Sequence, residues 1–161
     1  MKQAAALIAR RAHSRGELRR KLAAAQKMEK ADEIEAVLDR LEHLKLLNDA
    51  EYAYNFAFYR IKDLSWGEEK VRKALLGRDV TKADADRALE RVREEIEPGG
   101  MDGALMEYVE SCCRKHGTPS TLKDAQKLAR RLAGRGFDEN TITGALQRII
   151  PDIFRHFEAG D

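Results

Sequence analysis

The sequence contains little of what builds a disulfide-rich, β-rich or membrane-spanning protein. Of its 161 residues, 2 are cysteine, 3 are proline and 6% are aromatic. The two cysteines, Cys112 and Cys113, are adjacent and make no disulfide framework, so we expect a reducing, cytoplasmic setting. No window has the roughly 18 consecutive apolar residues of a membrane span. The apolar run at residues 4–9 is followed by two arginines, and we expect no signal peptide.

The chain is rich in charge and in helix-forming residues. Charged residues make up 36% of it, and alanine, leucine, glutamate, lysine and arginine outweigh the β-branched types, which favours helix throughout. Within this composition a hydrophobic ladder occurs three times, with the 3–4 spacing of a buried helical stripe. Its rungs are Leu18, Leu22, Ile34, Leu38 and Leu41, then Val71, Leu75, Ala85, Leu89 and Val92, then Leu128, Leu132, Ile142, Leu146 and Ile149.

A ladder that recurs about every fifty residues indicates a tandem array of one supersecondary unit. The sequence therefore predicts an elongated, all-α array of three three-helix, helix-turn-helix-like repeats, with its function on a surface rather than in a pocket. We place the repeats at 1–47, 48–97 and 101–150, followed by a short tail at 151–161. The linker at 97–100, a proline followed by glycines, is the candidate hinge. The predicted helices span 3–12, 14–26, 32–46, 49–63, 66–77, 82–96, 101–116, 119–134 and 138–150.

Helix starts are predicted from capping residues. The segments 14–17 and 65–68 each begin with serine and end with glutamate, the pattern of a capping box. Further caps are expected at Asn48, Thr81, Thr118 and Asp138, with Pro119 in a first helical turn. Tight turns follow the helices that end near Leu75 and Leu132. In each turn we expect an apolar residue to tuck under the helix end and an arginine, Arg78 or Arg135, to pair with the negative end of the helix.

Charge is distributed unevenly, although the net charge is only +2. Residues 1–30 hold 9 lysines and arginines against 2 glutamates, whereas residues 31–51 hold 2 against 7 acidic residues. Residues 114–135 hold 7 basic residues and a single aspartate. Two basic patches in corresponding parts of repeats favour a polyanion or an acidic protein as partner.

Several segments together resemble one family. They are SRGELRRKL at 14–22, LLNDAEYA at 46–53, Arg60 with 67–80, and LARRLAGRGF at 128–137. Their order and spacing resemble the RecX family over nearly the whole chain, although Asp79 stands where that pattern has glycine. The resemblance implies a bacterial regulator of the recombinase RecA, built of tandem three-helix repeats. Such a protein lies in the groove of the RecA–single-stranded-DNA filament and lowers ATP hydrolysis, strand exchange and repressor co-cleavage.

The basic residues are the candidate binding site. They suit contacts with DNA phosphates, on single strands or duplex, or with acidic patches of the recombinase, and none forms a clear set for base reading. We expect a monomer that needs no cofactor and binds no membrane. The expected partner-binding residues are Arg15, Arg19, Arg20, Lys21, Arg72, Lys73, Arg78, Lys123, Lys127, Arg130, Arg131 and Arg135.

Other functions stay open. A stand-alone helix-turn-helix-like protein would bind bare duplex with sequence preference, and a helical scaffold for another protein would have no effect on RecA. An enzyme or metal protein is disfavoured, because Cys112, Cys113 and His116 fall short of four zinc ligands and no phosphate loop or nucleophile motif is present. The aromatic cluster from Tyr52 to Trp66 is predicted as core, with base stacking as the alternative.

Overall fold

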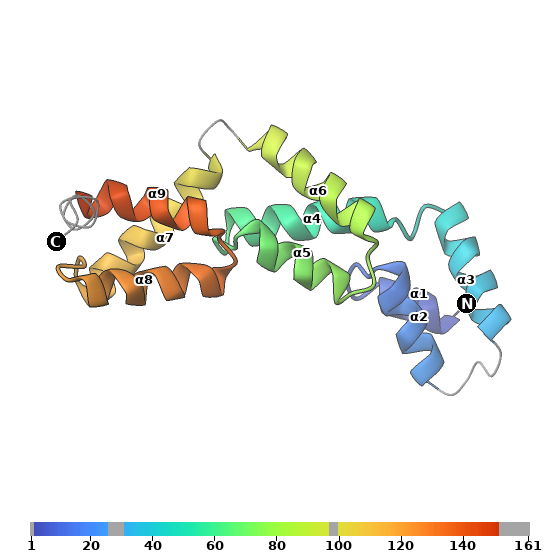
Figure 1. Cartoon of the computed structure of the whole chain (residues 1–161). Coiled ribbons are helices and arrows are strands. Elements are labelled where there is room, and N and C mark those ends of the chain that lie inside the picture. The colour runs from blue at the N-terminus through green and yellow to red at the C-terminus, as the bar shows by residue number, and fades with distance from the viewer. Residues whose placement is uncertain (1, 26–30, 97–99, 152–161) are drawn as a thin grey trace. The chain divides into compact units, whose positions relative to one another are not determined.

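The computed structural model of the chain describes residues 2–25, 31–96 and 100–151, and within these ranges it is helical without strands. The predicted all-α class is confirmed (Figure 1). Residues 26–30, 97–99 and 152–161, which include the core of the predicted hinge and most of the tail, lie outside the described residues. The helices are α1 (Lys2–Ile8), α2 (Arg15–Ala24), α3 (Ala31–His43), α4 (Asp49–Lys62), α5 (Glu68–Leu76), α6 (Lys82–Glu95), α7 (Gly100–His116), α8 (Leu122–Arg135) and α9 (Glu139–Ile149).

The chain divides into two compact units that interleave in sequence. The N-terminal unit comprises residues 1–58 and 72–92, and the C-terminal unit comprises 59–71 and 93–161. Both α4 and α5 therefore contribute to each unit. This division is a different one from the three predicted repeats, whose boundaries stay a prediction.

In the N-terminal unit, α2 packs against α1 and α3. The first ladder supplies the core there, since Leu18, Leu22, Leu38 and Leu41 are at most 1% exposed. Because burying a leucine stabilises a fold by about 1.5–3 kcal/mol, this stripe holds α2 and α3 together.

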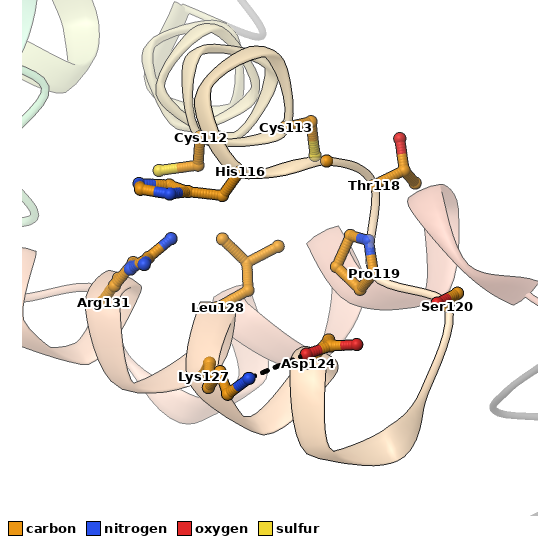
Figure 2. Close-up of a pocket in the computed structure, with 11 residues that line it drawn as sticks. Cys112, Cys113, His116, Thr118, Pro119, Ser120, Asp124, Lys127, Leu128 and Arg131 are labelled. Atoms are coloured by element: carbon orange, nitrogen blue, oxygen red, sulfur yellow. Dashed lines mark hydrogen bonds and ion pairs between the residues drawn. The ribbon is translucent and has the colours of Figure 1, made fainter.

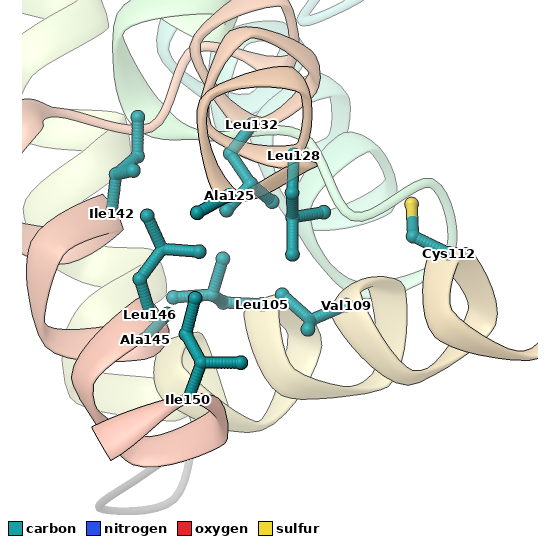
Figure 3. Close-up of a cluster of buried hydrophobic side chains, with 10 residues drawn as sticks. All are labelled: Leu105, Val109, Cys112, Ala125, Leu128, Leu132, Ile142, Ala145, Leu146 and Ile150. Carbon is teal, nitrogen blue, oxygen red and sulfur yellow. The ribbon is translucent and has the colours of Figure 1, made fainter. Parts of the chain in front are cut away.

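In the C-terminal unit, apolar side chains from α7, α8 and α9 converge on one cluster (Figure 3). Rungs of the third ladder, Leu128, Leu132 and Leu146, lie inside it, as predicted. Cys112 belongs to the same cluster at 7% exposure and packs there as a small apolar side chain.

Most of the described helices with a predicted capping residue begin at the position which that residue indicated. The amide of Glu17 donates to Ser14 Oγ (3.1 Å), and the side chains of Asn48, Thr81 and Asp138 accept the equivalent bond at α4, α6 and α9. The second hydrogen bond of this capping box, from the Ser14 amide to the Glu17 carboxylate, does not form, because that carboxylate pairs with Arg11 instead.

Two predicted helix starts are wrong. Ser65 has a left-handed backbone (φ 48°), whereas a capping residue is extended, and α5 begins only at Glu68. Thr121 caps α8 in place of Thr118, accepting from the Asp124 amide at 3.2 Å, so Pro119 precedes the helix.

The first helix is also shorter than predicted, ending at Ile8 instead of residue 12. The carbonyl of Arg11 accepts from the ring of buried His13 (Nδ1–O 2.8 Å), and the chain then turns to place Ser14 at the start of α2. No described helix is long and apolar enough to cross a membrane.

Candidate partner-binding surface

The basic side chains of α2 are paired with the acidic side of α3. The Arg15 guanidinium reaches Glu35 (2.7 Å), Asp39 (2.7 Å) and Glu42 (2.6 Å), and it is 21% exposed. Arg19 adds a second pair with Glu35. Two arginines of the basic first stretch therefore pair with three carboxylates of the acidic second stretch inside the unit.

This pairing shifts the titration of Glu35. Hydrogen bonds from Arg19 and Arg15 lower the pKa of Glu35 from its ordinary 4.5 to about 2. Because the pKa is lower in the folded state, the pairing stabilises the fold above the ordinary pKa. That stabilisation is lost as pH falls from about 4.5 to about 2.

We expect Glu35→Gln to lower the urea midpoint at neutral pH and to flatten its decline between those two pH values, since the amide carries no charge. The effect is modest because the pair is partly exposed. The matched control is Glu90→Gln, an exposed position whose side chain makes no ion pair with another described residue. Equal pH profiles for Glu35→Gln and the parent protein would contradict the prediction.

Further along α2, basic side chains contact a distant tight turn within the same unit. Arg20 Nε lies 2.8 Å from Asp79 Oδ2, and Ser14 Oγ donates to the carbonyl of Arg78. A Cβ placed on Gly16 would lie 2.1 Å from the Cβ of Asp79, so only glycine allows this approach. We name residues 14–20 with 77–79 the N-terminal junction. Asp79, where the family pattern has glycine, nevertheless adopts the left-handed backbone (φ 58°).

The C-terminal unit contains the corresponding contact. The amide of Gly67 donates to the carbonyl of Arg135 (2.8 Å), and Lys70 Nζ donates to the carbonyl of Gly134 (3.1 Å). A Cβ on Gly67 would lie 2.1 Å from the carbonyl oxygen of Gly136, whose φ of 88° itself favours glycine. Residues 64–70 with 134–136 form the C-terminal junction. In both junctions the start of one helix seats on a distant turn between two other helices.

Sequence reasoning missed these junctions, although the signal was present. The segments SRGE and SWGE carry glycine at the same position, and each glycine meets a turn of matching sequence, GRD at 77–79 or GRG at 134–136. The shared pattern predicts local capping, whereas in the fold it marks a long-range contact.

The two turn arginines are engaged within the chain. Arg78 donates to the carbonyl of Ala74 (2.7 Å) and lies over the Phe56 ring (4.6 Å), so its predicted pairing with a helix end is confirmed. Arg135 lies over the Tyr108 ring (4.4 Å) in the same way, but it donates to the carbonyl of Leu64 (2.7 Å) rather than to its own helix. The apolar turn residues fold back onto the helix ends as predicted. The backbone amide of Val80 donates a hydrogen bond to the carbonyl of Leu75 (3.2 Å), and that of Phe137 donates to the carbonyl of Leu132 (3.3 Å).

The remaining predicted site residues differ in their surroundings. Lys21 lies against His13 (2.8 Å) and Glu17 (3.4 Å), and Arg72 pairs with Asp86 (2.9 Å). Lys73, on α5, is exposed and makes no ion pair with another described residue.

The outer face of α8 is the open basic surface of the C-terminal unit. Its apolar side, Ala125, Leu128 and Leu132, faces the core. The opposite side carries four exposed cations at the spacing of one broad helical face. Only one of these four pairs with a described carboxylate, through a 3.0 Å contact between Lys127 and Asp124. We call this set the α8 basic face: Lys123, Lys127, Arg130 and Arg131.

The aromatic cluster is largely covered by cations and by the core. Tyr54 is buried beneath Arg91, whose guanidinium carbon lies 3.7 Å from the ring centroid. Arg60 and Lys70 lie 4.8 and 4.6 Å from the centroid of Trp66. Tyr59, at 52% exposure, is the most open of the described aromatic side chains. These contacts occupy ring faces that a stacking base would need.

These features define a protein whose described residues form helices without strands and that carries an exposed basic face on α8. The chain is 33% identical over 143 residues to the regulatory protein RecX of Pseudomonas tolaasii, covering 87% of this chain and 84% of the relative. A similar match, 33% over 139 residues, relates it to RecX of Ectopseudomonas mendocina. The chain therefore belongs to the RecX family of regulatory proteins, as its sequence segments indicated.

Other comparisons agree in fold. RecX of Pseudomonas fluorescens is 41% identical over 83 residues, about half of each chain. The crystal structure of RecX from Lactobacillus salivarius superposes with a TM-score of 0.78 at 19% identity, covering 92% of both chains. A second RecX crystal structure gives a TM-score of 0.76 at 17% identity, over 94% of this chain and 71% of the other. No protein-family model matches the chain.

Proposed function

We propose that this protein binds the RecA–single-stranded-DNA filament, lies in its groove and inhibits the recombinase. Inhibition would reduce ATP hydrolysis, strand exchange and co-protease function, and so act in homologous recombination, DNA repair and the SOS response. Membership of the RecX family supports this role. The structural observation that carries it is the α8 basic face, four exposed cations on one side of one helix.

The chemistry of that face suits a filament. A RecA filament presents DNA phosphates together with protein carboxylates, and lysine and arginine contact either without reading bases. Exposed cations also speed association with a polyanion. By contrast, Arg15 and Arg19 would have to leave α3 carboxylates before binding a partner. We therefore place the main contact on α8, with the other predicted residues in supporting or structural roles.

The decisive experiment measures the single-stranded-DNA-dependent ATPase of RecA while this protein is titrated in. We expect strong inhibition below one copy per recombinase, because a bound regulator acts on a filament of many subunits. The inhibition should weaken as salt rises, since phosphate contacts release counterions. Unchanged ATPase at equimolar protein would refute the proposal.

A second candidate is a stand-alone DNA-binding protein. Its support is the α8–α9 pair, two packed helices joined across a tight turn at Gly136, as in helix-turn-helix proteins. Tight, sequence-dependent binding to bare duplex without an effect on RecA would favour it. No effect on RecA and no DNA binding would leave the scaffold for another protein.

A further inference from the structure

A pocket of about 360 Å³ opens in the C-terminal unit between the end of α7 and the start of α8 (Figure 2). Its volume lies within the range of about 300–1,000 Å³ for small-molecule sites. Apolar groups, Leu128 and Cys112 among them, form part of its lining. The connecting segment adds Thr118, Pro119 and Ser120 to the lining, and Pro119 is buried.

An arginine and a histidine side chain face each other in this pocket. Figure 2 shows Arg131 reaching from α8 toward the ring of His116 on α7. Neither side chain makes an ion pair or a hydrogen bond with another described residue, and no carboxylate stands between them in that view. Arginine presents a planar fork of donors that matches oxyanions, and an imidazole N–H adds a further donor. A guanidinium that faces an imidazole in a pocket, without a counter-charge between them, favours a bound anion.

The remaining groups of the lining leave this arrangement cationic. Asp124 is its one carboxylate, and it already accepts from Thr121 Oγ1 (2.8 Å) and Lys127 (3.0 Å). These bonds lower the pKa of Asp124, so its charge balances that of Lys127. Burial raises the pKa of the Cys113 thiol, so no thiolate forms there to repel an anion.

We propose that this pocket binds a phosphomonoester dianion, the group carried by mononucleotides and by 5′-phosphorylated DNA ends. A phosphomonoester carries about −1.5 to −2 charges at neutral pH, whereas a backbone phosphodiester carries one. The Arg131 guanidinium, with the His116 ring facing it, matches the larger charge. This proposal does not depend on RecA.

The test compares two short oligothymidylates of equal length, one with a 5′-phosphate and one with a 5′-hydroxyl, by fluorescence anisotropy without RecA. We expect the phosphorylated strand to bind at least about tenfold tighter, since charge-assisted bonds to a terminal phosphate are strong. Competition with AMP and with adenosine identifies the source. If AMP but not adenosine displaces the oligonucleotides, and the 5′-phosphate gives no preference, the pocket binds free nucleotides. If the 5′-phosphorylated strand binds tighter and AMP does not displace it, the pocket binds DNA ends.

Variants separate the pocket from general attraction to DNA. Arg131→Ala and His116→Ala should remove the preference while keeping the fold, because both side chains are exposed. Lys123→Ala, on the same helix but outside the lining, should weaken both oligonucleotides equally and keep the ratio. Equal affinities in the parent protein with no displacement by AMP, or a preference that Lys123→Ala removes as fully as Arg131→Ala, would overturn the proposal.

Discussion

Replacing Gly67 by alanine is expected to lower the free energy of unfolding of the C-terminal unit by roughly 2–4 kcal/mol. The new Cβ would lie 2.1 Å from the carbonyl oxygen of Gly136 and 2.4 Å from the amide nitrogen of Phe137. Both are backbone atoms, so no side-chain rotation relieves the clash and the junction must open. Opening also breaks the 2.8 Å bond from the Gly67 amide to Arg135.

The measurement is urea unfolding followed by the fluorescence of Trp66, the chain's single tryptophan, which precedes Gly67. The matched control is Gly144→Ala in α9, where nothing lies within 4 Å of the new Cβ. That control should be neutral or stabilising by about 0.5–1 kcal/mol, because alanine favours helix over glycine. If Gly67→Ala proves as stable as the control, the junction does not hold the unit together.

Local patterns in this sequence predicted the helices well, because the side-chain spacing and the capping residues that signal a helix lie within that helix or next to it. Ladder spacing located α8 and α9, and the caps at Asn48, Thr81 and Asp138 fixed starts to a residue. The prediction of a helix start failed where a distant carbonyl accepted the hydrogen bond of a backbone amide at that start. The Ser65 segment has a local capping pattern, but the Gly67 amide is bound to Arg135, 68 positions later in the chain.

The candidate site was predicted less well, for a related reason. A count of charges along the chain treats Arg15 and Lys123 alike. In the fold, Arg15 forms ion pairs with three carboxylates, whereas Lys123 forms none with the described residues. Only the packing of α2 on α3 separates these cases. The pocket at His116 and Arg131 was likewise missed, since it joins residues from two helices whose separate patterns look ordinary.

Reversing the α8 basic face is expected to abolish most inhibition of RecA. The variant carries Lys123→Glu, Lys127→Glu, Arg130→Glu and Arg131→Glu. If each reversed charge costs about 1 kcal/mol of binding, the half-inhibiting concentration rises by roughly 10²–10³-fold. All four residues are exposed and none belongs to the core residues of α8, so the helix should remain folded.

The measurement is the RecA ATPase titration, repeated at several salt concentrations. The four reversals take the net charge from +2 to −6, so the control must match that change. Arg10→Glu, Arg40→Glu, Lys45→Glu and Lys82→Glu do so at exposed positions whose side chains make no ion pair with described residues. Because net charge acts at long range and a contact face acts locally, the control should keep most inhibition and its salt dependence. Equal loss in both variants would mean that overall charge, and not α8, attracts the protein to its partner.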